Sequence, residues 1–170
     1  IHNQKLHALT LAAIGHFGWT PPGSVGYENA FQVMRTLRLP YPEQEQQYRR
    51  MVFNAITRNV DDHVKNISFI MDRKGNWQLS PAYDLTFSVN QLDPLGEMHK
   101  MTINSKQDMI QFEDLVNVAN NMEINHPEKI IHNLLDVTEK WPEFAKKAGV
   151  SSEMILHIGN QHLNPRTLLL

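Results

Sequence analysis

The chain has 170 residues and a formal net charge of −2 at pH 7, and it contains no cysteine. A charge this close to neutral gives no reason to expect a nucleic-acid or membrane-surface ligand. The lack of thiols excludes disulfides, thiolate metal sites and a cysteine nucleophile. All apolar runs are shorter than the roughly 18–20 residues of a membrane span, so we expect a cytoplasmic protein without membrane contact. The length predicts a single domain over residues 1–170 with a full hydrophobic core.

Apolar residues at helical spacing predict three helices in the first third of the chain. They are expected over residues 3–14, 27–39 and about 43–58. The third has the clearest buried stripe, at Tyr48, Met51, Val52, Ala55 and Ile56. The glycine- and proline-rich segment between the first two helices includes the sequence GSVG at residues 23–26. We interpret GSVG as a helix–helix connection, because no strand precedes it and no lysine follows it at the spacing of a phosphate-binding loop.

A β-hairpin is predicted after the third helix. Its strands are the apolar residues 67–71 and the alternating residues 77–79, and Gly75 lies in the turn between them. Residues 89–106 have no periodicity and predict a long loop, a type of segment that often carries function. Further apolar stripes predict helices around residues 112–119, 130–141 and 154–158. The expected fold is therefore mostly α with a small central β-hairpin.

The most informative segment, NVDDHVKN at residues 59–66, lies between the third helix and the hairpin. Asp61 and Asn66 have the D-x-x-x-x-N spacing of the protein-kinase catalytic loop, where the aspartate takes the substrate hydroxyl proton and the asparagine holds magnesium. Asp84 follows the hairpin, as the second metal-binding aspartate of kinases does. Carboxylate and amide oxygens suit Mg²⁺, and Lys65 can bring positive charge to a transferred phosphoryl group. The pattern predicts a metal–nucleotide phosphotransfer centre.

Other residues of this segment have two possible roles. Asp62 is expected to orient the loop or face solvent rather than to catalyse. His63 is equally compatible with a phosphate contact and with a structural role in the loop, and Tyr83 with the nucleotide pocket and with the core. A hydrolytic metal centre built from Asp61, Asp62 and His63 is a weaker alternative, because consecutive side chains on a strand point to opposite faces.

These residues resemble a known family. The segment from Asn59 to Phe69, followed by LSPAYDL at residues 79–85, is similar to the C-terminal domain of HipA-family toxin kinases. Phe53-Asn54 and the helix start at Tyr27 also fit, and the similarity extends from the first helix to about residue 149. The resemblance implies a protein-kinase-like C-terminal lobe.

The resemblance also implies roles for single residues. Asp61 would be the catalytic base, and His63, Lys65 and Asn66 would contact the nucleotide phosphates, with Asn66 on magnesium. Tyr83 and Asp84 would complete the ATP site, with Asp84 as the second metal ligand. Kinases of this family transfer the γ-phosphate of ATP to a serine of a protein such as an aminoacyl-tRNA synthetase. A helix-turn-helix antitoxin restrains them, so contact with DNA would be indirect.

The chain departs from the family in what precedes the D-x-x-x-x-N motif. We find no strand-borne lysine and no glycine-rich phosphate loop there, so the sequence resembles a catalytic lobe whose N-terminal lobe lies elsewhere. Little or no kinase activity is expected from this lobe alone. The alternative function is a non-catalytic lobe that binds an antitoxin or a separate N-lobe partner.

Overall fold

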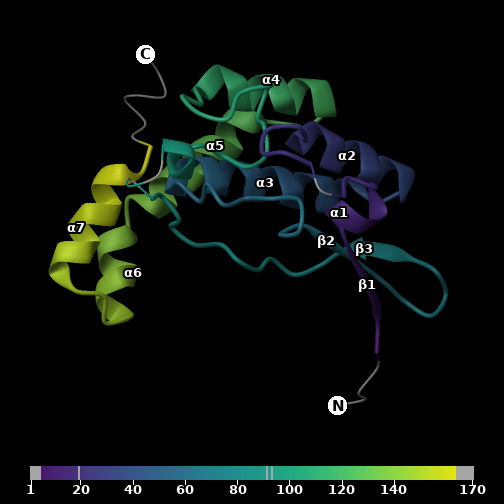
Figure 1. Cartoon of the computed structure of the whole chain (residues 1–170), viewed down its shortest axis with the longest axis horizontal. Coiled ribbons are helices and arrows are strands. Elements are labelled where there is room, and N and C mark those ends of the chain that lie inside the picture. Colours follow the sequence, from purple (N-terminus) through teal and green to yellow (C-terminus); the bar gives the residue numbers. More distant parts are fainter. Residues whose placement is uncertain (1–4, 19, 91, 93, 164–170) are drawn as a thin grey trace.

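The computed structural model describes residues 5–18, 20–90, 92 and 94–163. These residues are mostly helical with one small antiparallel sheet, as predicted (Figure 1). The elements in chain order are β1 (His7–Thr10), α1 (Leu11–Ile14), α2 (Tyr27–Thr36), α3 (Tyr41–Thr57), β2 (Ser68–Met71), β3 (Trp77–Leu79), the 3-10 helix η1 (Pro94–Glu97), α4 (Phe112–Met122), α5 (Pro127–Thr138), α6 (Trp141–Lys147) and α7 (Ser152–Gln161). None of the helices in these ranges is long and apolar enough to cross a membrane.

The N-terminal segment begins with a strand. The predicted helix over residues 3–14, whose first two residues lie outside the described range, is therefore wrong over β1. This strand pairs antiparallel with β2, where Leu9 lies opposite Phe69. Short apolar segments fit either periodicity, and backbone pairing with β2 decides the outcome here. Helix α1 starts only at Leu11, after the Thr10 hydroxyl accepts a hydrogen bond from a backbone N–H of the first turn.

The predicted hairpin is present as β2 and β3, and β1 adds a third strand in the order β1-β2-β3. Asp72 fixes the turn, because its Oδ1 accepts the N–H groups of Lys74 at 2.7 Å and Asn76 at 3.0 Å. The Asn76 side chain also donates to this carboxylate, and these bonds lower the pKa of Asp72. Gly75 has a φ of 86°, which a residue with a side chain adopts only with strain.

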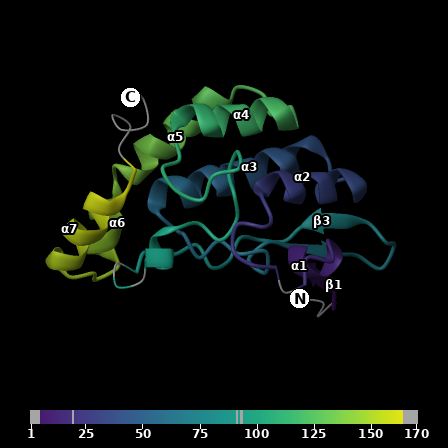
Figure 2. The same cartoon turned by 45° about the horizontal axis from the view of Figure 1, so that its top comes forward.

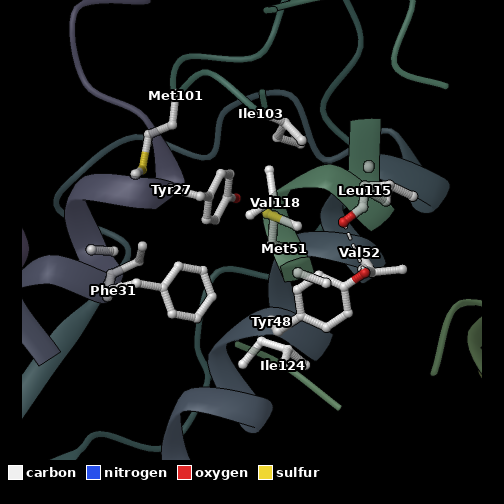
Figure 3. Close-up of a cluster of buried hydrophobic side chains, with 14 of the residues drawn as sticks. Tyr27, Phe31, Tyr48, Met51, Val52, Met101, Ile103, Leu115, Val118 and Ile124 are labelled. Atoms are coloured by element: carbon white, nitrogen blue, oxygen red, sulfur yellow. Dashed lines mark hydrogen bonds between the residues drawn. The ribbon is translucent and has the colours of Figure 1, made fainter. Parts of the chain in front are cut away.

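Helix α3 lies at the centre of the helical part. Its predicted stripe is buried without exception, at Tyr48, Met51, Val52, Ala55 and Ile56. Figure 3 shows Tyr27 and Phe31 of α2 and Leu115 and Val118 of α4 gathered around this stripe. The Tyr48 hydroxyl donates to the Leu115 carbonyl at 3.0 Å. Burial of each large apolar side chain contributes about 1.5–3 kcal/mol, so α3 provides a firm support for the loop that leaves its C-terminal end.

The described residues between 89 and 106 form a loop apart from η1, as predicted. It is not peripheral, because Met101 and Ile103 are completely buried in the main core (Figure 3). His99 is buried as well. The connection that contains GSVG joins α1 to α2, and its Gly26 forms a parallel bridge with Thr102 of the long loop. The long loop is thereby held beside the start of α2.

Helices α6 and α7 form a pair at the opposite end of the molecule from the sheet (Figures 1 and 2). Trp141 begins α6 instead of extending the preceding helix, and its Nε1 donates to the Ile155 carbonyl at 2.9 Å. The predicted stripe on the last helix is only partly buried. Ile158 is buried, whereas Met154 is 45 % exposed.

Candidate phosphotransfer site

The D-x-x-x-x-N segment forms the loop between α3 and β2. Helix α3 ends at Arg58, which has a left-handed backbone with a φ of 59°. This conformation turns the chain sharply, as helix C-caps do. The next N–H, that of Asn59, returns to the Asn54 carbonyl at 3.0 Å. The loop therefore departs in a fixed direction from the buried end of a helix.

A hydrogen bond explains the spacing of Asp61 and Asn66. The Asn66 side-chain Nδ2 donates to the Asp61 carbonyl oxygen at 3.0 Å, and the Asn66 N–H donates to the His63 carbonyl at 2.8 Å. These two bonds close the loop while the Asp61 residue stays exposed. Since the bond to Asp61 uses the amide nitrogen of Asn66, the amide oxygen remains available as a ligand.

Asn59 connects this loop to the segment that carries Asp84. It is 2 % exposed, and its Nδ2 donates to Asn54 Oδ1 and to the Asp84 carbonyl, both at 3.0 Å. Its Oδ1 accepts the Ser88 hydroxyl at 3.1 Å. The same Ser88 oxygen accepts the Asp61 N–H at 2.9 Å. One buried amide therefore fixes the backbones of both predicted chemical segments.

The roles of Asn59 and Ser88 were not predicted from the sequence. Asn59 sits just before the D-x-x-x-x-N motif, but its residue type does not distinguish a buried connector from a turn residue. Ser88 lies 29 residues further along the chain. No local pattern signals that it reaches Asn59, because that contact depends on the path of the whole hairpin.

Asp62 is 2 % exposed, so of its two predicted roles the orientation of the loop is confirmed and contact with solvent is wrong. Its carboxylate accepts the Tyr27 hydroxyl, the Lys100 N–H and His99 Nδ1, each at 2.8 Å. Burial and the neighbouring Asp62 charge raise the pKa of Tyr27 well above its ordinary value. Asn54 donates to the same Tyr27 hydroxyl at 2.9 Å. This cluster ties the D-x-x-x-x-N loop to α2, α3 and the long loop.

The sequence allowed Tyr83 to lie either in the core or beside the nucleotide pocket. Its ring is 41 % exposed, so it is not a core residue. Its hydroxyl donates to the Lys65 carbonyl and contacts the Ser68 hydroxyl. Tyr83 therefore clamps the backbone between Lys65 and β2, while Asp84, which follows it, takes a left-handed backbone with a φ of 56°.

The predicted site residues line two separate hollows. Asp61, His63 and Lys65 line an open pocket of about 350 Å³, whose far wall is the connection before α2. Asn66, Tyr83 and Asp84 line a much smaller cleft of about 20 Å³ against α3. The predicted metal ligands thus border the small cleft, and the predicted base borders the open pocket.

The oxygen donors of the small cleft fit a magnesium ion in chemical type. Asn66 offers an amide oxygen and Asp84 a carboxylate, which are the hard ligands that Mg²⁺ takes in ones and twos alongside phosphate oxygens and waters. The rival hydrolytic centre is not supported, because the Asp62 carboxylate is taken up by hydrogen bonds from Tyr27, His99 and the Lys100 N–H. Within the ranges that the structure covers, no group of three His, Asp or Glu residues is arranged to hold a metal ion.

Comparison with known proteins identifies the family. The model of the HipA-like C-terminal domain matches residues 2–151. A solved structure of HipA from Shewanella oneidensis MR-1, in complex with HipB and its operator DNA, superposes with a TM-score of 0.69 at 19 % sequence identity. The match covers 95 % of this chain and 44 % of that one, so the chain spans less than half the length of that HipA. No curated protein matches significantly. The chain belongs to the family of HipA-like C-terminal domains.

Proposed function

We propose that the chain is the catalytic lobe of a HipA-like kinase that transfers the γ-phosphate of ATP to a serine of a protein. The observation that supports this proposal most strongly is a pair of hydrogen bonds made by the loop. Asn66 is bound to the Asp61 backbone, and Asn59 binds the Asp84 backbone. The proposed base, Asp61, and the proposed metal ligands, Asn66 on the same loop and Asp84 beyond the hairpin, are thereby held on one frame.

In the proposed reaction Asp61 accepts the proton of the serine hydroxyl. The serine oxygen then forms a bond to the γ-phosphorus as the bond to the β-phosphate oxygen breaks. The exposed Asp61 lies beside the larger pocket, where an acceptor segment of a protein can reach it. Lys65 borders the same pocket and supplies positive charge for the transferred group.

Asn66 and Asp84 would hold Mg²⁺, which when bound neutralises charge on the β- and γ-phosphates. His63 borders the pocket of Asp61 and is proposed as a further phosphate contact. Its Nδ1 is buried and has no hydrogen-bond partner among the residues described. Tyr83 would complete the nucleotide site by holding the Lys65 backbone in place.

The remaining parts of the proposed system lie outside this chain. Because the chain spans less than half the length of the Shewanella HipA, we propose that an N-terminal lobe, on the same or another polypeptide, covers the nucleotide. The Shewanella protein is solved with HipB and operator DNA, which supports a DNA-binding antitoxin as a partner here. An aminoacyl-tRNA synthetase, the substrate type that the resemblance implies, would place the reaction in the cytoplasm.

Calorimetric titration of Mg·ATP into the chain, joined to an N-terminal kinase lobe, tests this proposal. We expect magnesium-dependent binding that is lost in Asp84→Ala and retained in the control Asp136→Ala, which alters an exposed residue of α5. Equal binding with and without magnesium would contradict the proposed metal pair. A complete lack of nucleotide binding would favour the alternative, a lobe that only docks an antitoxin or an N-lobe partner.

A further inference from the structure

Gln47 of α3 is an unusual buried residue. Its side chain is 0 % exposed, and neither Nε2 nor Oε1 has a hydrogen-bond partner within the described part of the chain. One turn further along the helix, Arg50 also buries its Nε without a partner, although its Nη2 donates to the Ser80 carbonyl at 2.7 Å. Most buried polar atoms in proteins are hydrogen-bonded, so these unpaired atoms on residues three apart in α3 point to a small polar ligand beside them.

Gln47 and Arg50 both line the small cleft that also contains Asn66, Tyr83 and Asp84. The cleft has a volume of about 20 Å³. A water molecule needs roughly 10–15 Å³ on the same measure and two to four polar partners. The interior of the cleft therefore accommodates one water, and a nucleotide or hydrated cation held by Asn66 and Asp84 would lie outside it.

The chemistry of the unpaired atoms selects the same ligand. Gln47 presents one acceptor and one donor, and Arg50 Nε presents a second donor. A cation cannot accept a hydrogen bond from Gln47 Nε2, and an anion cannot donate one to its Oε1. Water does both. After binding Gln47 and Arg50 Nε it keeps one O–H donor, which can reach one acceptor oxygen on the Asn66 and Asp84 side of the cleft.

We propose that this cleft is a binding site for one ordered water molecule, through which Gln47 and Arg50 position Asn66 and Asp84. The water site itself does not depend on any activity. The positioning role rests on the proposed kinase function, because it concerns the pair that would bind magnesium. Gln47 is then a positioning residue of that site.

A crystal structure of the chain tests the water site directly. We expect density for a water within hydrogen-bonding distance of both amide atoms of Gln47. A dry cleft, or a Gln47 amide that turns to a protein partner, would overturn the proposal.

The substitution Gln47→Leu tests the same site by stability, because the two readings predict opposite signs. If the Gln47 amide has no partner at all, leucine removes the free-energy cost of burying unpaired polar atoms, so the urea midpoint of unfolding rises. Where the amide holds a water, leucine strands that water and Arg50 Nε, so the midpoint falls. The control Gln46→Leu alters the exposed neighbour and should leave the midpoint nearly unchanged. A raised midpoint in Gln47→Leu refutes the water site.

The positioning role is tested by magnesium titration of ATP binding in the lobe-restored protein. Loss of an outer-shell partner typically weakens metal affinity about 10–100-fold, so Gln47→Leu should weaken the apparent magnesium affinity by about tenfold or more while Gln46→Leu does not. Unchanged affinity in Gln47→Leu refutes positioning. If the unsubstituted protein binds no Mg·ATP, the proposed kinase function fails, while the crystal structure and the urea series still decide the water site.

Discussion

Asn59→Ala tests the connection between the two chemical segments. The substitution removes three hydrogen bonds, to Asn54 Oδ1, to the Asp84 carbonyl and from the Ser88 hydroxyl. Each is worth about 1 kcal/mol net. The partly exposed Asp84 carbonyl can regain a bond from water, so we expect a loss of about 2–3 kcal/mol in the free energy of unfolding. With a urea m-value of about 2 kcal/mol/M, the midpoint should fall by about 1–1.5 M.

Urea unfolding followed by circular dichroism measures this loss. The control Asn133→Ala removes an exposed asparagine of α5, and a surface change of this kind stays within about 0.5 kcal/mol. A midpoint for Asn59→Ala that matches the control would refute the role of Asn59 as a connector. A fall in the midpoint with an unchanged m-value is the expected result, because the compactness of the unfolded chain does not change.

Three further predictions concern other parts of the frame. Asp62→Ala leaves its buried hydrogen-bond donors without an acceptor, so it should cost about 3 kcal/mol of stability and lower the melting temperature by about 6–12 °C. The control Asp61→Ala alters the exposed neighbour and should change the melting temperature little. Equal shifts in the two variants would contradict the scaffold role of Asp62. Tyr83→Phe removes the hydroxyl that holds the Lys65 carbonyl, so chemical unfolding should show a loss of about 1 kcal/mol, and no loss would refute the clamp. Burial raises the pKa of Asp114, but hydrogen bonds from Lys106, Asn104 and the Gln111 backbone outweigh it and lower the pKa overall. Because the pKa is lower in the folded state, ionised Asp114 stabilises the fold above the unfolded pKa of about 3.9. This stabilisation is lost as the pH falls below that value. The difference in unfolding free energy between the natural chain and Asp114→Asn should therefore stay constant from pH 7 to about pH 4 and shrink as the pH falls further. A difference that does not shrink below about pH 4 would contradict this linkage.

The predictions from periodicity succeeded where the signal spans several turns. The stripe on α3 is long enough to exclude a strand, and every one of its residues is buried. The segment that became β1 and α1 is too short for such a distinction, and pairing with β2 across 60 residues of sequence settled it. The sheet acquires its third strand from a contact that no local pattern encodes.

The sequence suggests which residues form the candidate site but not which residues support them. Asp61, Asn66 and Asp84 are candidates because of their spacing, and the bond between the Asn66 amide and the Asp61 carbonyl shows how that spacing closes the loop. No sequence pattern marks Gln47 as a site residue. A polar residue beside an apolar helical stripe gives no reason to expect a buried side chain. The relation of Gln47 to Asn66 and Asp84 emerges only when the hairpin has returned the chain to α3.

Transfer of the γ-phosphate from radiolabelled ATP to a protein serine is the most direct test of the proposed function. The chain joined to an N-terminal kinase lobe should phosphorylate serine, and Asp61→Asn should lower the rate by about 100-fold or more, since a general base contributes at least that much. The control Asp136→Asn, at an exposed position on α5, should retain full activity, and circular dichroism should show both variants folded. Undiminished serine phosphorylation by a folded Asp61→Asn variant would contradict the account.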